Sequence, residues 1–67
     1  MSRATTQERV LAYIRYHIAR HKIGPSNPEI GRALGLEQGH ISDVISDLKE
    51  LNRLKETGNI YRFEVLK

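Results

Sequence analysis

The chain has 67 residues, no cysteine and a net charge of +3, and its pI is near 9.6. A chain of this length forms one domain and buries only about 60% of the surface that its unfolded form exposes. The composition excludes a disulfide framework and a thiolate metal site, and the apolar stretches are too short for a signal region or a membrane span. We therefore expect a soluble cytoplasmic protein with no membrane partner.

The charge changes sign along the chain. Residues 1–22 hold five basic residues and one acidic residue, a net charge of +4, whereas residues 37–52 hold one basic and four acidic residues, a net charge of −3. The overall basic balance favours a polyanionic partner. The acidic segment weighs against simple electrostatic binding to DNA, because its carboxylates repel phosphates.

The first segment has the pattern of an amphipathic helix. Apolar residues recur three or four positions apart, namely Val10, Leu11, Ile14 and Ile18. Thr5 and Glu8 form a capping box at its start. The helix should end near Lys22, because Gly24 and Pro25 stop helices and open a turn.

A short second helix is expected over residues 27–34. Ser26 and Glu29 form another capping box before it. Gly35 should end it, because glycine accepts the left-handed conformation past a helix end. The second helix is therefore marked at both ends.

A third helix begins near Gln38 and stops at Asn52, another residue that accepts a left-handed conformation. One continuous apolar face runs along it, formed by Ile41, Val44, Ile45, Leu48 and Leu51. This face is expected to pack against the preceding helices.

The remaining residues predict a β-hairpin. Apolar side chains alternate after a glycine-asparagine pair, at Tyr61, Phe63 and Val65 after Gly58-Asn59. With Thr57 paired to Ile60, Leu54 lies opposite Phe63 and both face the core. The predicted order is three helices and then a two-stranded hairpin.

Residues 29–48 meet the demands of a helix-turn-helix. Gly31 falls where the two helices touch most closely, and Gly35 makes the turn between them. Apolar residues that hold the second helix of the motif onto the first are present at Leu36, Ile41 and Val44. The hairpin that follows makes a chance match less probable.

This layout resembles the winged helix-turn-helix family and, within it, the amino-terminal DNA-binding domain of the LexA repressor. The resemblance is carried by RVLAYIRYHI at residues 9–18, GPSNPEI at 24–30, RALGL at 32–36 and LKEL at 48–51. It covers nearly the whole chain. The layout is also similar to that of MarR-type regulators and Z-DNA-binding domains.

The resemblance implies an α+β, mainly α fold in which three helices precede a two-stranded β-hairpin wing. Residues 1–67 are expected to form this single domain, with residues 1–4 disordered. The self-cleaving and dimerising domain of a LexA-like repressor would begin beyond residue 67, so we expect no autopeptidase activity. A homodimer on a palindromic site is expected to add affinity, because each half-site contact set is small.

The family's docking mode implies that the third helix enters the major groove of double-stranded DNA. Its expected base-reading residues are Gln38, Gly39, His40, Ser42, Asp43 and Ser46, with Asp47 at the margin. Contacts to the DNA backbone are expected from Ser26, Asn27, Arg32, Arg53, Lys55, Gly58, Asn59 and Arg62. The expected function is that of a sequence-specific, repressor-like transcriptional regulator of phage, plasmid or prokaryotic origin.

Other chemistry has weaker support. His17 and His21 stand one helical turn apart, which is the spacing of a two-histidine metal site, but we expect no carboxylate or cysteine nearby to complete it. We therefore expect packing histidines and neither a metal nor another cofactor. No nucleophile turn or oxyanion-forming glycine pattern accompanies the serines and histidines, so no catalytic residue and no enzyme is expected.

The acidic third helix leaves a second function open. In a protein-interaction module, its carboxylates would pair with a basic surface on a host or partner protein. The fold alone does not distinguish this function from DNA binding. A salt titration does, because only DNA binding weakens log-linearly with salt in proportion to the phosphates contacted.

Overall fold

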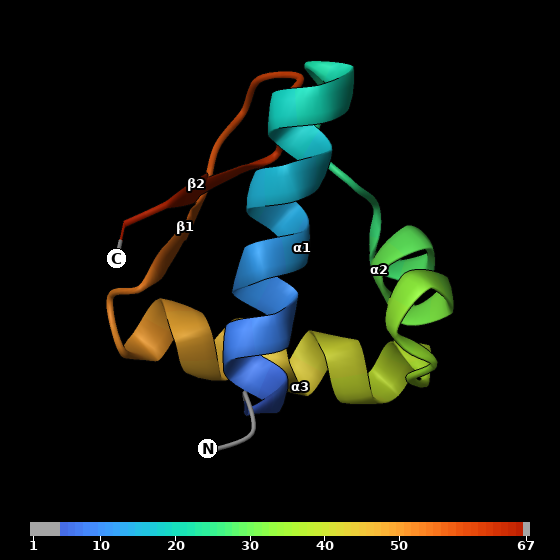
Figure 1. Cartoon of the computed structure of the whole chain (residues 1–67). Helices are drawn as coiled ribbons and strands as arrows, with labels where there is room; N and C mark the ends of the chain where they lie inside the picture. Colours follow the sequence, from blue (N-terminus) through green and yellow to red (C-terminus); the bar gives the residue numbers. More distant parts are fainter. Residues whose placement is uncertain (1–4, 67) are drawn as a thin grey trace.

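The computed structural model describes residues 5–66, so the expected disorder of residues 1–4 lies outside the described residues. Three helices, α1 (Thr6–His21), α2 (Asn27–Leu34) and α3 (Gln38–Glu50), precede two antiparallel strands, β1 (Leu54–Glu56) and β2 (Phe63–Val65). In Figure 1, α3 crosses the first turns of α1, α2 lies on one side of α1, and the hairpin rises on the other. The predicted winged arrangement is confirmed. None of the helices within residues 5–66 is long and apolar enough to cross a membrane.

Side-chain caps fix the starts of α1 and α2, as the sequence predicts. Thr5 Oγ1 accepts the Glu8 N–H at 3.1 Å, and the Glu8 carboxylate accepts the Thr5 N–H at 2.9 Å. Ser26 and Glu29 form the same pair of bonds, at 3.3 and 3.2 Å. Gly35 has a φ of 70°, so the left-handed stop of α2 is confirmed as well.

One apolar core lies between the helices and the hairpin. Its buried members are Val10, Leu11, Ile14, Ile30, Ile41, Val44, Ile45, Leu48, Leu54 and Phe63. The assignment of Leu51 to the buried face of α3 is wrong: α3 ends at Glu50, and Leu51 is 57% exposed in the turn that follows. Asn52 has a φ of 56°, which confirms the predicted left-handed stop after α3.

The turn between α2 and α3 closes against the backbone of Gly31. A Cβ atom at Gly31 would lie 2.7 Å from the carbonyl oxygen of Leu36. The carbonyl oxygen of Gly31 in turn accepts the N–H groups of Gly35 and Leu36, the latter at 2.8 Å. The close approach predicted for Gly31 is therefore confirmed, and its partner is the turn.

The predicted register of the hairpin is wrong by two residues. Leu54 lies opposite Val65, not Phe63, and Thr57 does not pair with Ile60. The reason is a six-residue loop, residues 57–62, closed by a hydrogen bond of 2.8 Å from the Thr57 N–H to the Arg62 carbonyl oxygen. A shift of two residues preserves the faces of a strand, so Leu54 and Phe63 are still buried.

The glycine-asparagine pair forms this loop in an unexpected way. The left-handed residue is Arg62, with a φ of 64°, and neither Gly58 nor Asn59 has a positive φ. The Asn59 side chain shapes the loop instead, because its Oδ1 accepts the Thr57 hydroxyl at 2.8 Å and the Tyr61 N–H at 2.9 Å. Hydrogen bonds to the Asn59 side chain thus shape the loop, and the two-residue turn that the sequence predicts at Gly58-Asn59 does not form.

The loop of the hairpin is attached to the connection between α1 and α2. The Gly24 N–H donates to the carbonyl oxygen of Ile60 at 2.9 Å. A Cβ atom on Gly24 would overlap the carbonyl group of Tyr61. Glycine at position 24 therefore allows the loop to lie directly on the connection, near the last turn of α1 (Figure 1).

Replacement of Gly24 tests this attachment. Gly24→Ala should lower the free energy of unfolding by more than about 2 kcal/mol, because overlapping backbone atoms must separate and carry the loop with them. Gly39→Ala is the matched control: it lies in α3 with no heavy atom within 4 Å of an added Cβ, so alanine should stabilise by up to about 1 kcal/mol. Urea unfolding measures both effects. Wild-type stability in Gly24→Ala would contradict the attachment.

Candidate nucleic-acid interface

The outer face of α3 presents every residue that the sequence assigned to base reading. Ile41, Val44, Ile45 and Leu48 point into the core and fix the orientation of the helix. The exposed residues are Gln38, Gly39, His40, Ser42, Asp43 and Ser46, together with Asp47. Within residues 5–66, no ion pair neutralises Asp43, Asp47 or Glu50. Contact of this face with base edges stays a prediction.

The start of α2 lies beside this face. The Asn27 side-chain amide donates to Ser42 Oγ, at 3.5 Å. The hydroxyl oxygen of Ser26 accepts the Glu29 N–H, so it is already part of the cap. Asn27 is thus the α2 side chain that joins the start of the helix to the predicted reading face.

A groove with a volume of about 660 Å³ separates the start of α2 from the hairpin loop. Five of the residues expected to touch the DNA backbone line it, namely Ser26, Asn27, Gly58, Asn59 and Arg62. The structure thus brings together residues that lie more than thirty positions apart in the chain. Asn27, at one border of the groove, also contacts Ser42 on α3.

The remaining three backbone candidates lie elsewhere. Arg53 lines a recess with Glu8 and Arg15 on the side of α1. Lys55 stands opposite Glu64 in the hairpin, and Arg32 borders the turn between α2 and α3. Of the three basic residues of the hairpin region, only Lys55 lies within a strand, because Arg53 precedes β1 and Arg62 belongs to the loop.

An ion pair that the sequence does not reveal joins α3 to the hairpin. Lys49 Nζ donates to Glu56 Oε1 at 3.1 Å, and both side chains are exposed. Glu56 also lines the groove, and Lys49 is the only lysine or arginine of α3. A spacing of seven residues across a helix end matches no local pairing pattern, so only the tertiary structure reveals the contact.

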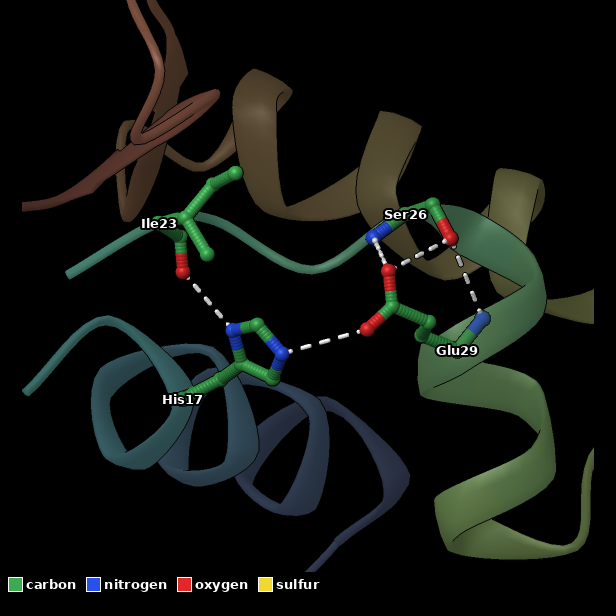
Figure 2. Close-up of polar contacts among 4 residues, drawn as sticks. All are labelled: His17, Ile23, Ser26 and Glu29. Carbon is green, nitrogen blue, oxygen red and sulfur yellow. Dashed lines mark hydrogen bonds and ion pairs between the residues drawn. The ribbon is translucent and has the colours of Figure 1, made fainter. Parts of the chain in front are cut away.

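A second unforeseen contact involves His17, which is 93% buried. Its Nδ1 lies 2.7 Å from the carbonyl oxygen of Ile23, and its Nε2 lies 3.2 Å from Glu29 Oε2 (Figure 2). The expectation that no carboxylate lies near the two histidines is therefore wrong. Both ring nitrogens of His17 face protein acceptors, and residues 5–66 contain no group of three or more potential ligands that could hold a metal.

The two capping carboxylates are stabilised in their ionised form. Two hydrogen bonds from Ser26, one from its N–H and one from its hydroxyl, hold the pKa of Glu29 below its usual range, and His17 adds to the effect. The pKa of Glu8 is lowered mainly by its bonds with Thr5. Both glutamates thus stay ionised to a lower pH in the folded chain than in the unfolded chain.

These shifts predict a loss of stability in acid. Each carboxyl group has a lower pKa in the folded state, so its contribution is complete above the ordinary glutamate value of about 4.3 and disappears as the pH falls through the lower folded value. The melting temperature should therefore fall as the pH is lowered below about 4.3. In the double variant Glu8→Gln, Glu29→Gln this fall should be clearly smaller, and an equal fall would assign acid unfolding to other groups.

No curated protein matches the chain. The family model described as the LexA DNA binding domain matches residues 1–64, which is nearly the whole chain. The match confirms the resemblance drawn from the motifs, and with it a repressor-like regulator that binds double-stranded DNA. The chain belongs to the LexA DNA-binding domain family.

Proposed function

We propose that this domain is a non-enzymatic, sequence-specific transcriptional regulator that binds double-stranded DNA with α3 in the major groove. The observation that carries the proposal is the position of Asn27, which contacts Ser42 on α3 and lines the groove with Gly58 and Asn59 of the hairpin loop. The start of α2 therefore lies next to α3 on one side and to the groove and the hairpin loop on the other. A helix in the major groove with a loop on the neighbouring backbone or minor groove has this arrangement.

The exposed α3 side chains suit direct reading of bases. Gln38 offers an amide that can bond adenine on two atoms, and Ser42 and Ser46 can bond several bases. Asp43 can accept from the amino group of cytosine. Gly39, with no side chain, lets the backbone approach the bases closely, and His40 lies at the edge of the same face.

Groups outside α3 supply the backbone contacts in this proposal. Asn27 contacts a phosphate from the start of α2, next to the capping residue Ser26, and Gly58, Asn59 and Arg62 contact the flanking backbone or minor groove. Arg32, Lys55 and Arg53 lie outside the groove, so they contribute by reach and long-range attraction. Two copies would meet on a palindromic site, in the cytoplasm of a prokaryotic host or on phage or plasmid DNA.

Selection of bound sequences from a random duplex pool tests this function. Enrichment of a defined site supports it and gives the spacing of half-sites. A salt titration on the selected duplex should show a log-linear loss of affinity. The absence of duplex binding even at low salt would reject the proposal and favour a protein partner for the acidic face of α3.

Asp43→Ala tests the reading role of α3. It should cost about 1–3 kcal/mol on the selected site by deleting a contact to cytosine, and leave the affinity for scrambled duplex unchanged or slightly higher. Glu50→Ala, which removes an equal charge from the last turn of α3, is the matched control and should preserve the preference. Equal losses on both duplexes would exclude Asp43 as a base reader.

Glu56→Gln tests the role of the ion pair beside the groove. Without the Glu56 carboxylate, Lys49 becomes free to contact a phosphate, so affinity for all duplex sequences should rise and the salt slope should steepen by about one unit. Glu64→Gln removes the same charge from β2 and should raise affinity less, because Glu64 forms no ion pair within the described residues. Fluorescence anisotropy at several salt concentrations measures both; identical gains would show only a change in net charge.

A further inference from the structure

His17 lies between the two structures that border the groove. Its ring projects from α1 toward the connection to α2, with Ile23 on one side and Glu29 on the other (Figure 2). Glu29 belongs to the first turn of α2 and holds the cap with Ser26. Ile23 belongs to the connection on which the hairpin loop lies. The buried side chain of His17 thus contacts both α2, which forms one side of the groove, and the connection that carries the hairpin loop on the other side.

The link to the hairpin loop runs through one peptide group. The carbonyl oxygen of Ile23 faces His17 Nδ1 at 2.7 Å. The N–H of the same peptide, on Gly24, donates to the carbonyl oxygen of Ile60 in the loop at 2.9 Å. A continuous series of hydrogen bonds therefore runs from the cap of α2 through Glu29, His17 and this peptide to the loop.

The two partners of His17 favour its protonated form. A carbonyl oxygen and a carboxylate are both acceptors, and neither has a proton to donate. A neutral imidazole donates through one nitrogen only, so it satisfies one of the two contacts and places a lone pair against the other. Both contacts are satisfied together only by the imidazolium, which donates from both nitrogens.

The alternative, in which Glu29 carries the proton, is disfavoured by its other partners. Glu29 Oε1 accepts the N–H and the hydroxyl of Ser26, at 3.2 and 3.1 Å. These bonds favour the ionised carboxylate and lower the pKa of Glu29. The arrangement of acceptors therefore suits a protonated His17 facing an ionised Glu29.

We propose that His17 is a positioning residue whose positive charge fixes the start of α2 relative to the hairpin loop and so makes the affinity for DNA depend on pH. The inference rests on the proposed function, because the groove between these two elements is the surface assigned to the DNA backbone. While His17 is protonated, both contacts are intact. As the pH rises and the imidazolium loses its proton, one contact is lost, the two sides of the groove are held less tightly, and affinity falls.

Other titratable groups lie beside the ring of His17 or on the outer face of α3. Tyr13 and His21 on α1 place their ring centroids 5.8 and 4.6 Å from that of His17. His21 is exposed and His40 lies on the outer face of α3, so protonation of either attracts phosphate without any role in positioning. The experiment must separate the pair of His17 and Glu29 from these two histidines.

Glu29→Gln makes that separation. Glutamine keeps the acceptor that the capping box requires, and its amide N–H₂ can donate to the Nε2 of a neutral His17. The variant therefore satisfies both ring nitrogens without a charge, while His21 and His40 are unchanged. His21→Gln is the matched control that removes a neighbouring titratable group and keeps the ion pair.

The test measures Kd for the selected duplex, and the melting temperature of the free domain, from about pH 5.5 to about pH 8.5, which brackets the ordinary histidine value of about 6.5. In the wild type and in His21→Gln, Kd should rise with pH by up to about tenfold per unit, the limit for one linked proton. In Glu29→Gln the rise should be much smaller. The melting temperature should fall as the pH rises in the wild type and in His21→Gln, and it should change much less in Glu29→Gln.

The possible failures are distinguishable. If the wild type binds the duplex with the same pH profile as Glu29→Gln, the positioning role is overturned and the proposed function stands. If the wild type binds no duplex at any pH, the proposed function falls and the inference falls with it. If only the melting temperatures differ between the two proteins, His17 acts on stability alone and its control of DNA affinity is overturned.

Discussion

The carboxylate of Glu29 joins the start of α2 to α1, and the rest of the structure depends on this junction. One oxygen accepts two bonds from Ser26 and so defines where α2 begins, while the other faces His17 of α1. An eight-residue helix has little stability of its own, so its position has to come from such tertiary contacts. The start of α2 in turn places Asn27 beside α3. The geometry of the candidate interface therefore depends on the junction that Glu29 forms.

The hairpin depends on the connection between α1 and α2, which lies next to the same junction. Two strands of three residues form a ribbon that would be marginal by itself in water. Its buried residues Leu54 and Phe63 anchor the strands in the core, but the loop lies beyond them and is held by Gly24. The absence of a Cβ at this position is therefore a requirement of the interface as much as of the fold, since a displaced loop would open the groove.

Local patterns in the sequence predict the helices well, because caps and left-handed stops act over three or four residues, as at Ser26 with Glu29 and at Gly35. They fail where the deciding contact is distant. The hairpin register depends on the Asn59 side chain and on the bond from Gly24 to Ile60, which a glycine-asparagine pair does not reveal. Likewise, His17 looked like a packing residue on α1, and its charge partner lies twelve positions away in the next helix.

The placement of charge on α3 has a consequence for selectivity once this helix is taken as the reading element. Its one cation, Lys49, is engaged by Glu56, while Asp43, Asp47 and Glu50 have no ion-pair partner within the described residues. Attraction to arbitrary DNA must then come from cations outside α3, and the helix itself lowers non-specific affinity. A duplex that offers no acceptable donor to these carboxylates leaves them desolvated against phosphates, which penalises wrong sites more than right ones. An acidic reading helix would thereby trade affinity for discrimination, with the general attraction to DNA supplied by cations outside α3.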